Sequence, residues 1–176
     1  MHYGSYFGGL YCVELNPETG MTMQPEDHGH LIARRANYRK DNLEAPEIMY
    51  QPNLANIICL SSYDPLMTTY NVRVAYSGSP EGPFVDFYGE DIKDTTNNVP
   101  ILTAPYRFEN HPGWAGTAHC GLIDAGDGRY FMVHQGRLSP PEPVDGFACA
   151  QSVLYGEWMA CGFSRTLCRY CSTFFH

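Results

Sequence analysis

Long apolar runs and basic residues are both scarce in this sequence. No stretch reaches the roughly 18 consecutive apolar residues of a membrane-spanning helix, so a membrane partner is not expected. Lys and Arg number 11 against 19 Asp and Glu, a formal net charge of −8, whereas a nucleic-acid partner would favour a basic face. The first residues also lack a charged and then apolar leader, so no export signal is visible.

Helical periodicity is nearly absent as well. Glycine (17) and proline (13) together make up 30 of the 176 residues, and short strand-like runs recur between turn signals. Residues 70–77 alternate, which predicts a strand with one shared face. That face is expected to carry Tyr70, Val72, Val74 and Tyr76. The pattern predicts an all-β chain and leaves sandwich, barrel and propeller open.

Three further segments support this prediction. Residues 9–15 form a second predicted strand, closed by the turn Asn16-Pro17-Glu18-Thr19-Gly20. Residues 122–123 and 130–133 flank the glycine-containing turn 124–128, which predicts a hairpin. Residues 57–60 are apolar on both faces, as in a buried central strand. Cysteines 12, 59 and 120 sit singly among apolar neighbours, which favours buried small hydrophobes over disulfides or ligands.

Glu44 is the first candidate for chemistry. It lies between apolar residues and before a proline, in Leu43-Glu44-Ala45-Pro46-Glu47-Ile48. A carboxyl group in apolar surroundings keeps its proton more readily than one in water, which suits a general acid. The alternative is an ordinary exposed glutamate at a strand end. Glu47 is the competing candidate and has more the character of a solvated turn residue.

A second candidate region surrounds His119, within Gly116-Thr117-Ala118-His119-Cys120-Gly121. Its small neighbours would let the backbone approach a ligand closely, although a lone histidine also serves structural roles. Trp114 precedes it, in Pro112-Gly113-Trp114-Ala115-Gly116. Its indole could form a platform for a sugar ring or pack in the core. Both alternatives stay open for each residue.

Five stretches in order resemble glycoside hydrolase family 43, and its arabinanase-like members most closely. They cover roughly residues 3–140. In chain order they read YGSYFGGL (3–10), LEAP (43–46), SYD (62–64), SGSPEGPFVD (77–86) and GTAHC (116–120). The resemblance implies a partial five-bladed β-propeller of about three blades and the hydrolysis of α-L-arabinofuranosyl or β-xylosyl linkages with inversion.

The resemblance also implies roles for individual residues. Glu44 matches the general acid that protonates the leaving oxygen. Ser5, Tyr6 and Phe7 match the segment that lines the sugar site. His119 matches the histidine that holds a central calcium, usually through water. The implied substrates are arabinan, arabinoxylan or xylan-type oligosaccharides, met by a secreted or periplasmic enzyme.

Two departures from the family pattern limit these expectations. An inverting mechanism needs a second carboxylate about 6.5–9.5 Å from the acid to activate water. The family pattern places that aspartate, and a further one that tunes the acid, before Met1. In addition, Ala118 stands where glycine usually precedes the histidine, which weakens the expected metal site. The rival interpretations are a propeller that binds carbohydrate without turnover and a truncated product without function.

The C-terminal segment departs most from the family. Its cysteines have the two-residue gap of a metal knuckle, but their spacings fit no standard zinc site. They are Cys149, Cys161, Cys168 and Cys171, followed by His176. A structural tail closed by disulfides is the other alternative.

A shift of the reading frame explains this segment better. Moved one nucleotide forward with permitted codons, residues 144–170 can be read as WMVLHVRSLFYTGNGWPVVSPERYAGT, the ending expected of the family. Trp158-Met159 and Met159-Ala160 force the Gly-Trp pair in that reading. We therefore interpret residues 1–140 as part of a catalytic propeller domain and residues 141–176 as an aberrant tail. Such a tail is expected to pack poorly, because it was never selected for a core.

Overall fold

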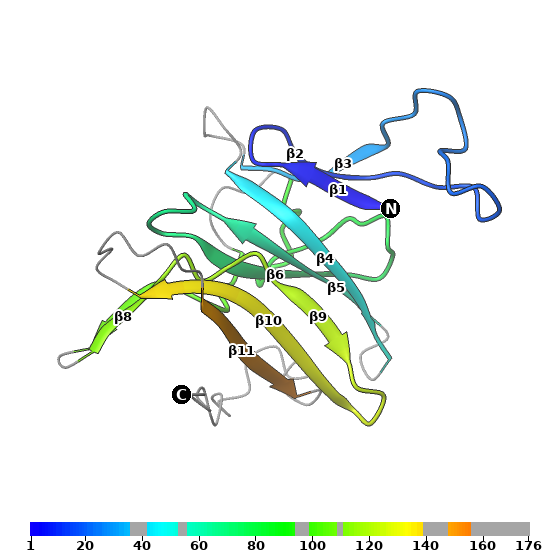
Figure 1. The fold of residues 1–176 in the computed structure, drawn as a ribbon. Helices are drawn as coiled ribbons and strands as arrows, with labels where there is room; N and C mark the ends of the chain where they lie inside the picture. The colour runs from blue at the N-terminus through cyan, green and yellow to red at the C-terminus, as the bar shows by residue number, and fades with distance from the viewer. Residues whose placement is uncertain (36–41, 53–55, 94–98, 109–110, 139–147, 156–176) are drawn as a thin grey trace.

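The computed structural model describes residues 1–35, 42–52, 56–93, 99–108, 111–138 and 148–155. Within these ranges the chain forms strands and no helix, and the strands make three antiparallel sheets (Figure 1). The all-β prediction is therefore confirmed. No helix in the described part of the chain is long and apolar enough to cross a membrane.

The three sheets follow one another along the chain. The first has the order β1-β2-β3, with β1 (His2–Ser5), β2 (Gly9–Cys12) and β3 (His30–Ala33). The second has the order β4-β5-β6, with β4 (Leu43–Gln51), β5 (Asn56–Tyr63) and β6 (Asn71–Ser77). The third has the order β11-β10-β8-β7, and β9 also pairs with β10. Its strands are β7 (Tyr106–Phe108), β8 (His111–Ala115), β9 (Gly121–Asp124), β10 (Arg129–Leu138) and β11 (Ala148–Tyr155).

Most predicted turns and strands fall where the sequence pattern placed them, but the strand predicted over 9–15 is too long, because β2 ends at Cys12 and Leu15 makes only an isolated bridge to Thr22. The hairpin β9–β10 pairs Asp124 with Tyr130 across the glycine-containing turn. Residues 57–60 lie in β5, the central strand of the second sheet, as expected of a run that is apolar on both faces. Cysteines 12, 59 and 120 are buried free thiols, also as predicted. Burial raises the pKa of the Cys59 and Cys120 thiols to about 12, so both behave as small hydrophobes.

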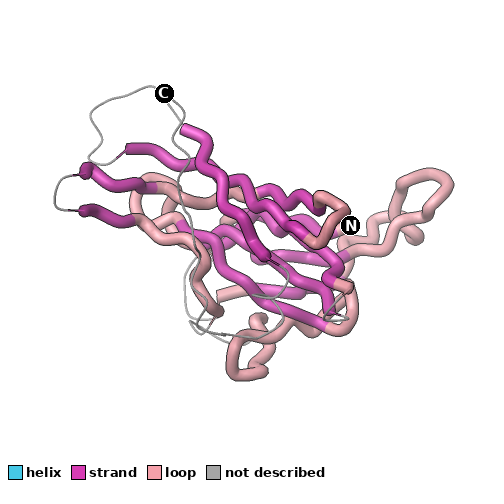
Figure 2. The backbone as a smooth tube through the Cα atoms, turned by 90° about the horizontal axis from the view of Figure 1, so that it is seen from below, coloured by secondary structure: helices cyan, strands magenta, loops and turns pink. Residues whose placement is uncertain are grey.

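The central strand β5 of the second sheet is buried on both faces because this sheet lies between the other two. Successive side chains of β5 point to opposite sides. Ile58 and Leu60 join a core cluster with Ala118 and Met132 of the third sheet region. Cys59 joins a separate cluster with the first sheet, whose members there are Leu10, Cys12, Ile32 and Ala33. Figure 2 shows the strands gathered in one body, from which the loop between β2 and β3 projects.

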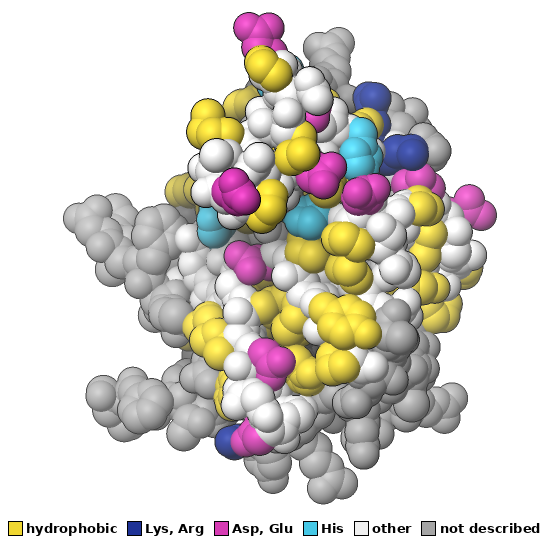
Figure 3. All heavy atoms as spheres, turned by 90° about the vertical axis from the view of Figure 1, so that its right-hand side faces the viewer, with side chains coloured by type: hydrophobic (Ala, Val, Ile, Leu, Met, Phe, Trp, Pro, Cys, Tyr) yellow, Lys and Arg dark blue, Asp and Glu magenta, His cyan; other side chains and the backbone are white. Residues whose placement is uncertain are grey.

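Polar contacts also fix the first sheet to the second. The His2 Nε2 atom lies 2.5 Å from the Pro80 carbonyl oxygen, and the His30 Nε2 atom lies 2.8 Å from that of Glu81. The loop 78–83 is thereby held against the first sheet. Figure 3 shows this side of the molecule, where acidic side chains mix with exposed apolar ones. Met21 and Met23, in the projecting loop, are 69% and 47% exposed.

The structure places a strand within the segment interpreted as an aberrant tail. β11 pairs antiparallel with β10 from Arg129↔Tyr155 to Gly136↔Ala148. Backbone pairing of this kind requires no particular side chains, so it is compatible with an out-of-frame sequence. Cys161, Cys168, Cys171 and His176 lie outside the described residues, so the origin of the tail stays a prediction.

Gly29 offers a test of how tightly the first sheet packs. Its φ is +66°, and an added Cβ would overlap the Cys12 carbonyl group and stand 2.8 Å from Val13 Cβ. Gly29→Ala should therefore cost on the order of 3 kcal/mol of unfolding free energy, from left-handed strain plus the clash. Gly20→Ala is the matched control, because Gly20 has a φ of +70° but nothing within 4 Å. It should cost only about 1 kcal/mol. Equal midpoints of urea unfolding for the two variants would contradict the packing shown for Gly29.

Candidate active site

Glu44 lies at an irregularity that turns its side chain out of the regular strand pattern. Glu44 pairs with Ser62 and Glu47 with Leu60, so β4 carries one more residue than β5 between these pairs. Ala45 takes up the distortion with a φ of +51°. Such bulges re-aim side chains and occur often beside active sites. Glu44 is half-buried, which differs from an ordinary exposed strand end.

Tyr70 brings Glu44 and His119 together, although they are 75 residues apart in the chain (119 − 44). The Tyr70 hydroxyl donates to Glu44 Oε1 at 2.7 Å and lies 3.3 Å from His119 Nδ1. The His119 backbone N–H donates to Ser62 Oγ at 2.8 Å, and Ser62 is the residue of β5 that pairs with Glu44. Burial, and then the bond to Glu44, raises the pKa of Tyr70 above its ordinary value. The phenol is therefore a hydrogen-bond donor at neutral pH.

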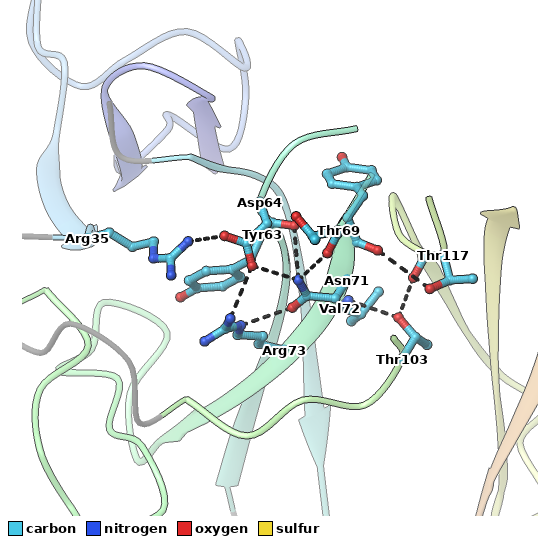
Figure 4. A network of polar contacts seen from close by, with 10 residues as sticks. Arg35, Tyr63, Asp64, Thr69, Asn71, Val72, Arg73, Thr103 and Thr117 are labelled. Carbon is cyan, nitrogen blue, oxygen red and sulfur yellow. Dashed lines mark hydrogen bonds and ion pairs between the residues drawn. The ribbon is translucent and has the colours of Figure 1, made fainter. Parts of the chain in front are cut away.

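Threonine hydroxyls hold the His119 segment against β6. The Val72 N–H donates to Thr103 Oγ1 at 2.9 Å, and that hydroxyl donates to the Thr117 carbonyl oxygen. The Thr117 hydroxyl donates to the Tyr70 carbonyl oxygen at 3.5 Å. Figure 4 shows this chain of contacts. It places the backbone just before His119 beside the backbone of Tyr70.

A buried ionic cluster lies beside this site, and we call Arg35, Asp64, Asn71 and Arg73 the Asp64 clasp (Figure 4). Arg35 Nη1 donates to Asp64 Oδ1. Asn71 Nδ2 and Arg73 Nη2 donate to Asp64 Oδ2 at 2.8 and 3.2 Å. Arg35 is 4% exposed and Arg73 is 7% exposed. One carboxylate therefore serves two buried guanidinium groups, which is costly unless the hydrogen bonds are well made.

The backbone joins the Asp64 clasp to the predicted sugar-site segment. The Asn42 N–H donates to the Tyr6 carbonyl oxygen at 2.9 Å, and the Asp64 N–H donates to that of Asn42 at 2.8 Å. Asn42 and Asp64 have φ values of +52° and +70°, which Asn and Asp tolerate better than most residues. These two hydrogen bonds connect the turn after β1 to Asn42, which immediately precedes β4 and lies two residues before Glu44.

The remaining predicted residues are placed as follows. Ser5 and Phe7 are exposed, Phe7 to 64%, and Tyr6 contacts Phe7 edge-on at 5.3 Å between ring centroids. Trp114 is half-buried in β8 and packs close to Gly136 of β10. Among the described residues, no hydrogen bond or ring contact joins Trp114 to Glu44 or His119. Its role as a sugar platform stays a prediction.

The sequence alone did not identify two residues that contact the candidate site, Tyr70 and Ser62. Tyr70 was expected only as one member of an alternating apolar face, and Ser62 only as part of a matching segment. The signal for Tyr70 is a polar hydroxyl at a position that the alternation buries, because a buried phenol needs a hydrogen-bond partner. Glu47, the competing acid, lies instead near Cys120, whose raised pKa owes more to burial than to the Glu47 charge.

The side chains around His119 show how this region could hold calcium. Calcium takes six to eight oxygen ligands. Among the described residues, no group of three or more His, Cys, Asp or Glu side chains is placed to hold a metal. His119 is exposed and contributes one ring nitrogen besides that engaged by Tyr70. These residues therefore fit a metal only through its bound water.

Comparison with known proteins confirms the resemblance to family 43 arabinanases. The chain is 35% identical over 96 residues to extracellular endo-α-(1→5)-L-arabinanase 2 of Bacillus subtilis, which is 53% of this chain and 20% of that protein. It is 30% identical over 105 residues to the extracellular endo-α-(1→5)-L-arabinanase of Thermotoga petrophila, which is 58% of this chain and 22% of that protein. The matched region thus spans about a fifth of each relative. No protein-family model matches the chain.

Solved structures identify the class of fold. The endo-1,5-α-L-arabinanase of Thermotoga petrophila superposes with a TM-score of 0.75 at 24% identity, over 88% of this chain and 37% of that one. The family 43 glycoside hydrolase YxiA of Bacillus licheniformis gives 0.73 at 23%, over 87% and 37%. A Cellvibrio cellulosa α-L-arabinanase in complex with arabinohexaose gives 0.65 at 22%, over 88% and 48%. The three sheets are accordingly blades of a partial five-bladed β-propeller, as predicted.

Proposed function

We propose that this chain is part of an inverting glycoside hydrolase that cleaves α-1,5-linked L-arabinan outside the cell. The observation that carries the proposal is the position of Glu44, a half-buried carboxyl at a bulge, bonded to Tyr70 at 2.7 Å beside His119. The names of the relatives support arabinan as the substrate and an extracellular location. They give no support to xylan.

Each residue has a distinct role in this proposal. Glu44 protonates the glycosidic oxygen as the bond to the anomeric carbon breaks, which is general acid catalysis. Ser5, Tyr6 and Phe7 lie at the end of β1 and in the following turn, where they would contact the sugar. His119 would bind a water molecule, and calcium would bring such water when it is bound. Calcium would supply electrostatic stabilisation only, and the steps assigned to Glu44 do not depend on it.

Sugar binding provides the first test, because it does not require turnover. Arabinohexaose titrated into the purified chain should give saturable heat in calorimetry, and xylohexaose should bind more weakly. Phe7→Ala should weaken arabinohexaose binding by roughly 2- to 10-fold, from the loss of about 0.5–1.5 kcal/mol of ring contact. Tyr88→Ala is the matched control, since Tyr88 is an aromatic residue of similar exposure (71%) in the loop 84–93. Equal losses in both variants would remove the 5–7 segment from the proposal.

A further inference from the structure

The hydroxyl of Tyr70 has one proton to donate, and Glu44 and His119 both lie close enough to receive it, while the Ser62 hydroxyl also bonds the phenol. Glu44 Oε1 lies at 2.7 Å and His119 Nδ1 at 3.3 Å. An ionised carboxylate only accepts hydrogen bonds, whereas a neutral imidazole nitrogen either donates or accepts according to the tautomer. The shorter contact is to the carboxylate, so the phenol proton points to Glu44.

This assignment leaves the phenol oxygen as an acceptor toward His119. A contact at 3.3 Å is then favourable only when Nδ1 carries the imidazole proton. We propose that Tyr70 is a positioning residue that fixes His119 in the Nδ1–H tautomer and holds one oxygen of the Glu44 carboxyl. The three groups form one directed chain, from His119 Nδ1–H to the Tyr70 oxygen and from the Tyr70 hydroxyl to Glu44 Oε1.

The surrounding residues restrain two members of this hydrogen-bond chain, His119 and Tyr70. The His119 backbone is held by the Ser62 hydroxyl at 2.8 Å and has a φ of +54°. Tyr70 is fully buried by its neighbours in the core cluster that includes Val72, Ala118 and Cys120. The phenol therefore has little freedom to exchange its partners. The backbone bond at Ser62 and the ring bond at Tyr70 together set the orientation of the imidazole.

Two consequences follow for the site. The lone pair of His119 is placed on Nε2, which can then accept a hydrogen bond from water, from metal-bound water or from a sugar hydroxyl. Glu44 Oε1 is occupied by Tyr70, so Oε2 is the oxygen on which a transferable proton would sit. This second consequence rests on the proposed function, whereas the tautomer does not.

The tautomer can be measured in the chain itself by long-range ¹H–¹⁵N correlation of the imidazole groups. Spectra would be recorded near pH 8, so that the two tautomers of the neutral imidazole are compared. His119→Gln identifies the signals of His119 among the seven histidines. Wild-type His119 should show a protonated Nδ1 and an unprotonated Nε2. An Nε2–H tautomer in the wild type would overturn the proposal.

Two variants test whether Tyr70 is the cause. Tyr70→Phe removes the acceptor of the Nδ1–H group, so the Nδ1–H form should lose its dominance. Glu44→Leu removes the acceptor of the phenol proton, so the Tyr70 hydroxyl can donate to His119 Nδ1 and favour the Nε2–H tautomer. This variant keeps the test decisive if Tyr70→Phe does not fold. Tyr130→Phe removes a phenol from the same core cluster and should leave the tautomer unchanged. Retention of Nδ1–H in both site variants would also overturn the proposal, whatever the result for arabinan hydrolysis.

Discussion

Replacing Asp64 by alanine should lower the free energy of unfolding by about 3–5 kcal/mol, because it removes a carboxylate that two almost fully buried guanidinium groups share. Asp64 accepts bonds from Arg35, Asn71 and Arg73, and both arginines are almost fully buried. Their guanidinium groups also lie over the Tyr63 ring, with Cζ at 5.7 Å for Arg35 and 4.8 Å for Arg73. That ring cannot replace a carboxylate, since its attraction for a cation is much weaker.

The loss is measured by urea unfolding followed by tyrosine and tryptophan fluorescence, with the midpoint compared at unchanged slope. Asp127→Ala is the matched control. Asp127 also pairs with an arginine, at 2.6 Å to Arg129 Nη2, but that pair is exposed (58% and 50%) in the β9–β10 hairpin. Exposed pairs contribute little, so the control midpoint should hardly move. Equal shifts in the two variants would show that the Asp64 clasp carries no special stability.

The strands were predictable from local pattern because side chains of a strand alternate between two faces. Alternation located β6 and the β9–β10 hairpin, and the doubly apolar run 57–60 located the centre of the second sheet. Tyr70, Val72 and Val74 do share one core cluster, as predicted. Tyr76, however, is 43% exposed, because the core ends before the strand does. Alternation gives the face of a residue but not the extent of the neighbouring sheet.

The Asp64 clasp and the Tyr70 contacts could not be predicted in the same way. Arg35 and Asp64 are separated by 29 residues, and Tyr70 and His119 by 49. Their meeting depends on the packing of one blade on the next, for which a single sequence has no local signal. The bulge at Ala45 similarly depends on the register of β4 against β5. Glu44 and His119 were found only through motifs, which carry this three-dimensional information indirectly.

Turnover should depend on carboxylates outside this chain as well as on Glu44. An inverting glycosidase pairs its acid with a base about 6.5–9.5 Å away. Asp64 is a poor base, because Arg35, Arg73 and Asn71 occupy its oxygens. The family pattern assigns the base and a tuning aspartate to positions before Met1. We therefore expect the purified chain to hydrolyse linear arabinan at least about 10²-fold more slowly than a version extended upstream and restored in frame after Ser139.

In the extended enzyme, the contribution of Glu44 as general acid can be measured separately from that of the other groups. Glu44→Gln should lower kcat on linear arabinan by about 10²–10⁴-fold, the usual contribution of a general acid. The same variant should lose far less on a nitrophenyl arabinofuranoside, because nitrophenolate leaves without needing a proton. Glu47→Gln, three residues further along β4, should affect neither substrate strongly and serves as the control. Equal losses of the Glu44 variant on both substrates would assign the residue to binding or folding, because only proton donation depends on the basicity of the leaving group.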